Sequence, residues 1–128
     1  MTRLLLICLG GALGTGARAL VMQAAPRLLG LAFPYGTLIV NVVGSFLISL
    51  IMSLSLQGAW ISPTLRVVLT TGFLGGLTTF STFSAEVVER LLAHQLGWAL
   101  ALAGTHLAGS LLMTYLGLLT VGADKLFS

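Results

Sequence analysis

Charged side chains are scarce in this sequence, which has only three Asp and Glu and six Lys and Arg among 128 residues. They make up 7% of the chain, whereas an ordinary soluble domain has about 25%. So few charges cannot cover a water-facing surface, and a soluble fold is excluded. The basic residues are scattered singly and form no basic patch, so nucleic acid is not an expected partner despite the net charge of +3.

Candidates for catalytic or metal chemistry are equally few. Cys8 is the single cysteine, so no disulfide can form within the chain, and no His or Cys lies near it at metal-ligand spacing. No pair of catalytic carboxylates and no nucleophile with an adjacent base is evident, so an enzyme is not expected. We interpret His106 as a hydrogen-bonded packing residue rather than a haem or metal ligand.

Long apolar runs dominate the sequence instead. Hydrophobic residues make up 57% of the chain, and a helix that crosses a hydrocarbon core of about 30 Å needs only about 20 of them. Pro26 and Arg27 indicate a turn after the first run, and Ser62-Pro63 is typical of a helix start. We therefore predict an all-α membrane protein, a single domain over residues 1–128, with spans near 4–22, 37–56, 64–92 and 96–121.

The first span resembles a secretory signal peptide, because Arg3 precedes an apolar run that ends in small residues. We predict an uncleaved helix, since the small residues continue into Arg18 and a further apolar stretch.

Two glycine pairs have the spacing of close helix contacts. Gly10 and Gly14 lie four residues apart in the first span, and Gly72 and Gly76 do so in the third. Small residues at this spacing let the backbones of membrane helices approach closely. The pairs indicate tight helix packing.

The basic residues are balanced between the two sides of the membrane. Four spans place Arg3, Arg66 and Lys125 on one side and Arg18, Arg27 and Arg90 on the other. Orientation follows the bias in Lys and Arg, and here there is none. We therefore expect insertion in both orientations, which allows two inverted copies to pair about a two-fold axis in the membrane plane.

Hydroxyls and glycines replace apolar residues in the middle of the third span. A single Ser or Thr there normally bonds back to its own helix, but Gly75-Gly76 followed by Thr78 and Thr79 indicates a helix break. A break at membrane depth is tolerated only where it is buried or lines a wet cavity. The carbonyls that it frees could hold a cation.

Phe80 and Phe83 are three residues apart, so they share one face of the helix after the break. Phenyl rings carry positive edges, and ring edges beside hydroxyl donors would attract a small anion without a buried positive charge. The alternative is that both rings are ordinary core aromatics.

Several polar side chains allow two interpretations each. Asn41, in an apolar run one turn after Thr37, is either a hydrogen-bonding link between helices or an ion ligand. Arg18, near the predicted end of the first span, could reach the membrane interface, give a vestibule positive potential, or do both. We expect Glu86 and Glu89 to form a solvated helix end.

The segment Gly72-Phe73-Leu74-Gly75-Gly76-Leu77-Thr78-Thr79-Phe80-Ser81-Thr82-Phe83-Ser84 resembles the signature of the Fluc (CrcB) family of fluoride ion channels. Residues 36–41 look like the family's second-helix motif, residues 10–18 like its first helix and residues 109–117 like its fourth. The resemblance covers nearly the whole chain in the same order.

The resemblance implies a passive fluoride channel that exports fluoride from the cytoplasm across the bacterial inner membrane and so reduces fluoride toxicity. It implies an antiparallel, dual-topology homodimer with two pores. By similarity, the pores are lined by Asn41, Phe80, Phe83, Thr37, Thr82 and Ser110. Arg18 would serve the aqueous vestibule, and the carbonyls of Gly75 and Thr78 from both subunits would hold a structural sodium ion at the dimer centre. Some members have Tyr and Ser where this chain has Leu102 and His106, which leaves that side of the pore unassigned.

Two other functions remain alternatives. A small multidrug transporter is also a four-helix, dual-topology dimer, but its proton coupling needs a carboxylate in the first span, and residues 4–22 contain none. A membrane subunit that packs against larger partners without transporting anything is the second alternative.

Overall fold

The computed structural model describes residues 1–58 and 60–122, and all the regular structure in these ranges is helical. The elements are α1 (Thr2–Leu29), α2 (Tyr35–Leu56), α3 (Pro63–Val67), the π-helical η1 (Val68–Leu74), α4 (Gly75–Leu77), α5 (Phe80–Leu92) and α6 (Leu96–Thr120). With α3 to α5 taken as one rod (Pro63–Leu92), four helices are long and apolar enough to cross a membrane. The predicted four-helix organisation is confirmed.

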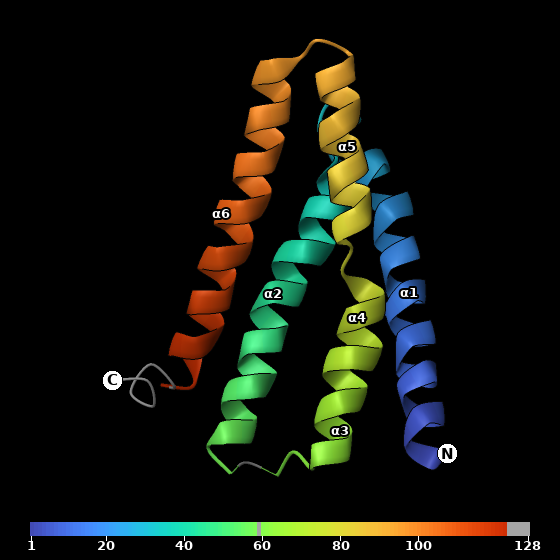
Figure 1. Ribbon diagram of the computed structural model, residues 1–128, viewed down its shortest axis with the longest axis vertical. Coiled ribbons are helices and arrows are strands. Elements are labelled where there is room, and N and C mark those ends of the chain that lie inside the picture. Colours follow the sequence, from blue (N-terminus) through green and yellow to red (C-terminus); the bar gives the residue numbers. More distant parts are fainter. Residues whose placement is uncertain (59, 123–128) are drawn as a thin grey trace.

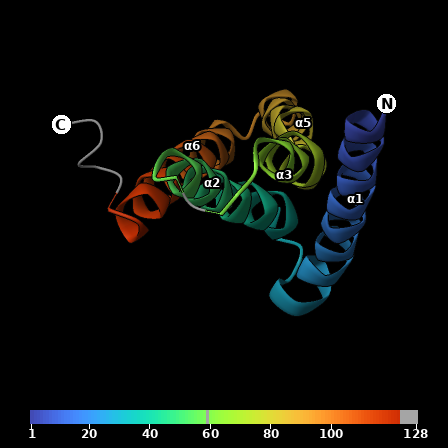
Figure 2. The ribbon, with the colours of Figure 1, turned by 90° about the horizontal axis from the view of Figure 1, so that it is seen from below.

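The four rods run lengthwise and are joined at alternate ends (Figure 1). The α5–α6 connection lies at one end, and the start of α1, the α2–α3 connection and the end of α6 lie at the other. Seen from below, α2 and α3 lie between α1 on one side and α6 on the other (Figure 2). Lys125, which entered the predicted charge balance, lies outside the described residues.

The first helix is longer than predicted, because Pro26 does not end it. Proline lacks an N–H and normally breaks a helix interior, but here it lies in the last turn, where the Gly30 N–H bonds to the Pro26 carbonyl. The helix therefore reaches Leu29. At 1.5 Å per residue, Arg18 lies roughly 16 Å before that end, deep in the span rather than near its edge.

Glycines allow α1 to pack directly against the third span. A Cβ added to Gly14 would overlap the Phe73 carbonyl, and one added to Gly72 would come within 2.8 Å of the Ile7 oxygen. Gly76 likewise faces the Gly11 carbonyl. The predicted tight packing through both glycine pairs is confirmed.

Helix α2 packs against the third span and against α6. Val40 of α2, with Leu74 and Leu77 of the third span, forms the buried apolar cluster. Against α6, a Cβ at Gly117 would overlap the Ser49 hydroxyl. These contacts place the middle of α2 beside the hydroxyl-rich part of the third span.

Candidate functional site

The helical backbone of the third span is interrupted at Thr78 and Thr79. Their φ and ψ are −82° and 158°, and −152° and 114°, which are extended conformations. Gly75 and Gly76 are themselves helical. The interruption falls on two β-branched residues, which favour extended backbone, and the Thr79 hydroxyl caps α5 by accepting from the Thr82 N–H at 3.3 Å.

Asn41 holds the interruption from the neighbouring helix. Its Nδ2 donates to the Thr79 carbonyl at 2.9 Å, and its Oδ1 accepts from the Thr79 N–H at 2.8 Å. The side-chain amide thus pairs with both polar groups of one extended residue, which would otherwise be buried without partners. Asn41 therefore links α2 to the third span, and its role as an ion ligand stays a prediction.

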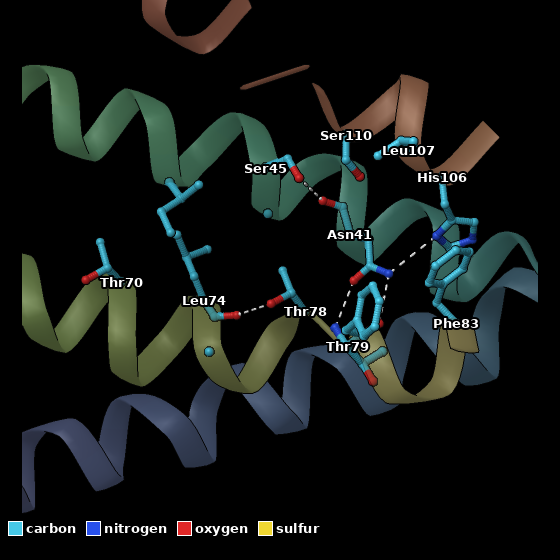
Figure 3. A pocket seen from close by; sticks show the side chains of 14 residues that line it. Asn41, Ser45, Thr70, Leu74, Thr78, Thr79, Phe83, His106, Leu107 and Ser110 are labelled. Atoms are coloured by element: carbon cyan, nitrogen blue, oxygen red, sulfur yellow. Dashed lines mark hydrogen bonds between the residues drawn. The ribbon is translucent and has the colours of Figure 1, made fainter. Parts of the chain in front are cut away.

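A cavity of about 410 Å³ lies beside the interruption (Figure 3). It brings together six of the residues predicted to line the pore or to hold the sodium ion: Asn41, Gly75, Thr78, Phe80, Phe83 and Ser110. Among the described residues that line it, none is Asp, Glu, Lys or Arg. Hydroxyl, amide and imidazole groups supply its polarity, alongside apolar walls such as Leu74 and Leu107 (Figure 3).

The two phenylalanines meet at this cavity. Their ring centroids are 5.6 Å apart and the ring planes make an angle of 63°, an edge-to-face contact. Phe83 also stacks on His106 at 4.5 Å, so its ring is held between α5 and α6. Phe80, by contrast, is 78% exposed, and its outer face has no cover from the described chain.

Thr37 and Thr82, also predicted at the pore, do not line this cavity. Thr37 is fully buried and donates to Oε1 of Glu86 at 2.5 Å, where it lines a second cavity of about 270 Å³. The Thr82 hydroxyl accepts from the Thr79 hydroxyl at 3.0 Å and belongs to the cap of α5.

Arg18 is half-buried and points toward the third span, and its predicted role at a vestibule stays a prediction. Its guanidinium donates to the Thr78 carbonyl at 3.1 Å, which puts a positive charge at the interruption. The prediction that it sits near the end of the first span is wrong, because α1 continues past Pro26.

Two backbone carbonyls at the interruption have free capacity to bind a hard cation. In a continuous helix the Thr79 N–H would bond to the Gly75 carbonyl, but here it donates to Asn41, so the Gly75 carbonyl loses that donor. The Thr78 carbonyl keeps one lone pair beside its bond from Arg18. Carbonyl oxygens are ligands that hard cations prefer.

Glu86 is the polar residue whose place the sequence interpretation missed, whereas His106 packs against Phe83 and lies within hydrogen-bond distance of Asn41, as interpreted. Glu86 is half-buried and its Oε2 has no partner among the described residues, so the predicted solvated helix end is wrong for it; Glu89 is exposed. His106 is only 4% exposed. The sequence did contain a signal for the partial burial of Glu86: it lies three residues after Phe83 and therefore on the same helix face.

Comparisons with known proteins agree on one family. Residues 5–118 match the family described as "CrcB-like protein, Camphor Resistance (CrcB)". A protein of Dechloromonas aromatica named "Fluoride-specific ion channel FluC" is 51% identical over 97% of this chain and 91% of its own length. Proteins of the same name from Pseudomonas aeruginosa and Anaeromyxobacter are 47% and 46% identical, over 92% and 94% of this chain and 92% and 96% of their own lengths.

Proposed function

The chain belongs to the CrcB-like family, and on that premise we propose that it is a fluoride-specific ion channel that conducts fluoride passively across the membrane. It is a multi-pass membrane protein with four helices able to span the bilayer. Conduction breaks no covalent bond, so no catalytic residue is required. Export of fluoride from the cytoplasm across a bacterial inner membrane, which lowers fluoride toxicity, is the role we propose for it.

One observation carries the proposal: a cavity at membrane depth offers neutral donors and aromatic edges, with no charged side chain among the described residues that line it. A small anion binds its water strongly, so it enters a pore only if protein donors replace that water. The Asn41 amide, the Ser110 hydroxyl and the edges of Phe80 and Phe83 are such groups. Binding must also be weak enough for the anion to leave, which neutral donors allow.

Two features of the single chain support an inverted homodimer. Phe80 lines the cavity yet is 78% exposed, and Gly75 beside it is also exposed. A second copy would cover both, and the balanced distribution of Lys and Arg permits the opposite orientation. A C-terminal tag should then be accessible from both sides of the membrane in a population of cells; access from one side alone would contradict dual topology.

The same arrangement supports a structural sodium ion at the dimer centre. Gly75 and Thr78 of each chain would supply carbonyl oxygens, and two copies would double the ligand set. The ion would fix the two interruptions against each other. Its charge would also make the neighbourhood favourable to an anion.

Fluoride efflux from liposomes tests the function and its site together. Wild-type protein should release fluoride rapidly, as read with a fluoride electrode. Asn41→Asp replaces the donor amide with a negative charge, and Phe80→Ile removes a ring edge, so each should lose most of the flux. The control is Thr120→Ala, since this exposed hydroxyl only bonds back to Leu116 of its own helix. Unchanged efflux in both site variants would show that these residues do not line the pore.

A further inference from the structure

Arg18 of α1 lies beside the backbone that we propose as the sodium site. Helix α1 runs alongside α4, which ends directly before Thr78 (Figure 1). A Cβ added to Gly14 would lie 3.0 Å from the Leu77 nitrogen, so the two backbones touch one turn before Arg18. This contact brings the next turn of α1 to the interruption, where Nη1 of Arg18 donates to the Thr78 carbonyl at 3.1 Å.

The guanidinium and the proposed ion would share one oxygen. A carbonyl oxygen has two lone pairs, and Arg18 occupies one of those on Thr78. The other is free for a cation, together with the Gly75 carbonyl, whose helical donor is missing because the Thr79 N–H bonds to Asn41. A cation held at this oxygen therefore lies next to a fixed positive charge.

No carboxylate offsets this charge at the cavity beside the interruption. The described residues that line the cavity include no Asp or Glu, and Glu86 bonds to Thr37 at the second cavity. In the inverted homodimer that we propose, the second copy would bring its own Arg18. The cation would then have neutral carbonyls as its ligands and two guanidinium groups as its neighbours.

Such a site discriminates between cations by their charge. Calcium also binds backbone carbonyl oxygens, so the ligands alone do not exclude it. The repulsion between a fixed charge and an ion is proportional to the charge of the ion, so Arg18 repels a divalent cation with twice the energy with which it repels sodium. Where this repulsion weakens sodium binding about tenfold, it weakens calcium binding about a hundredfold.

We propose that Arg18 sets the valence selectivity of the cation site: its positive charge, held at the Thr78 carbonyl, makes the site accept a monovalent ion in preference to a divalent one. The inference rests on the sodium ion of the proposed function. Arg18 is not a ligand in this role. It acts on the ion through its charge and through the oxygen that both contact, and without it the same carbonyls would form a site open to calcium.

Cation-dependent stabilisation of the purified full-length protein tests this role without a flux measurement. The thermal unfolding midpoint in detergent is followed while sodium chloride or calcium chloride replaces choline chloride at constant ionic strength. An ion that binds only the folded protein raises the midpoint, so sodium should raise it for wild-type protein and calcium should not. In Arg18→Gln, which keeps a neutral N–H donor, half-maximal stabilisation should need about tenfold less sodium, and calcium should now raise the midpoint.

Three further variants separate the local charge from other effects. Arg18→Lys keeps the charge and should respond like wild type. Arg18→Met is a second uncharged variant and should gain the same calcium response, so poor folding of one neutral variant does not hide the effect. The matched control is Arg27→Gln, which removes the same charge from an exposed position of α1 and should leave the cation response unchanged. Calcium that stabilises wild-type protein as well as sodium does, or neutral variants that still respond to sodium alone, would overturn the proposal.

Fluoride efflux from liposomes, measured on the same preparations, distinguishes the inference from the channel function. If wild-type protein releases fluoride and its midpoint responds to neither cation, the inference fails and the channel function stands. If the midpoints follow the expected cation pattern and no fluoride is released, the channel function fails and the role of Arg18 stands.

Discussion

Single polar side chains hold this site by pairing with groups on a neighbouring helix. Asn41 satisfies both backbone groups of Thr79, Arg18 bonds to the carbonyl of Thr78, and Thr37 bonds to Glu86. Each contact joins an unbroken helix to the interrupted one. The interrupted segment is therefore fixed by the neighbouring helices, although the Thr79 N–H has left the helical hydrogen-bond ladder for Asn41.

The Thr37–Glu86 contact leads to a prediction about stability. Thr37→Val keeps the shape of the side chain but leaves both oxygens of Glu86 without a partner among the described residues. We expect a loss of about 1–3 kcal/mol in unfolding free energy, seen as a lower midpoint in thermal unfolding of the protein in detergent. Thr105→Val, at an exposed position of α6, should leave the midpoint unchanged. A Thr37→Val midpoint equal to that of wild type would show that the contact contributes nothing.

Sequence patterns located several site residues but not their partners. The polar groups in apolar runs and the Phe spacing pointed to Asn41, Phe80 and Phe83, and all three lie at one cavity. The partners of Arg18 and Glu86 could not be predicted, because each lies more than 45 residues away in the chain. Such contacts depend on how the helices pack, which periodicity does not encode.

At the scale of helices, the glycines and the threonines have different structural roles. The glycines of α1 and of the third span remove side-chain bulk where the two backbones touch, while Thr78 and Thr79 interrupt the helix. The sequence interpretation placed the interruption in the segment from Gly75-Gly76 to Thr78 and Thr79, and the structure has it on the two threonines. Close packing against Gly11 and Thr15 keeps Gly76 helical instead.

The glycine contacts predict a contrast between two substitutions in α1. Gly14→Ala would push a methyl group into the Phe73 carbonyl, so we expect α1 to be displaced and the protein to be destabilised by about 1–3 kcal/mol or more. Gly16→Ala meets no atom within 4 Å in this chain and should be tolerated. Thermal unfolding and size-exclusion profiles of both variants check this. Similar behaviour of the two would contradict close packing at Gly14.

Span boundaries were the most predictable feature of the helices. Runs of apolar residues and the Ser62-Pro63 start placed three spans within two residues of their observed limits. The first span was misjudged because a proline in the last helical turn removes only one hydrogen bond and need not end the helix.

At the scale of the whole molecule, the cavity is a half-covered site. Phe80 presents 78% of its surface outward although it lines the cavity, and an inverted second copy would cover it in the homodimer that we propose. The four-helix count and the even spread of Lys and Arg were readable from the sequence. The exposure of Phe80 was not, because it depends on which face of α5 the other helices leave free.

The claim that the chain conducts fluoride through neutral donors is tested by the reversal potential of the purified protein in a planar bilayer, with fluoride at unequal concentrations on the two sides, chloride as the balancing anion and equal pH. If neutral donors and ring edges replace the water around fluoride and let it cross, the current reverses near the equilibrium potential of fluoride. This reversal potential does not change when a proton gradient is added. A current that follows chloride or protons, or a bilayer that stays silent, would contradict the account.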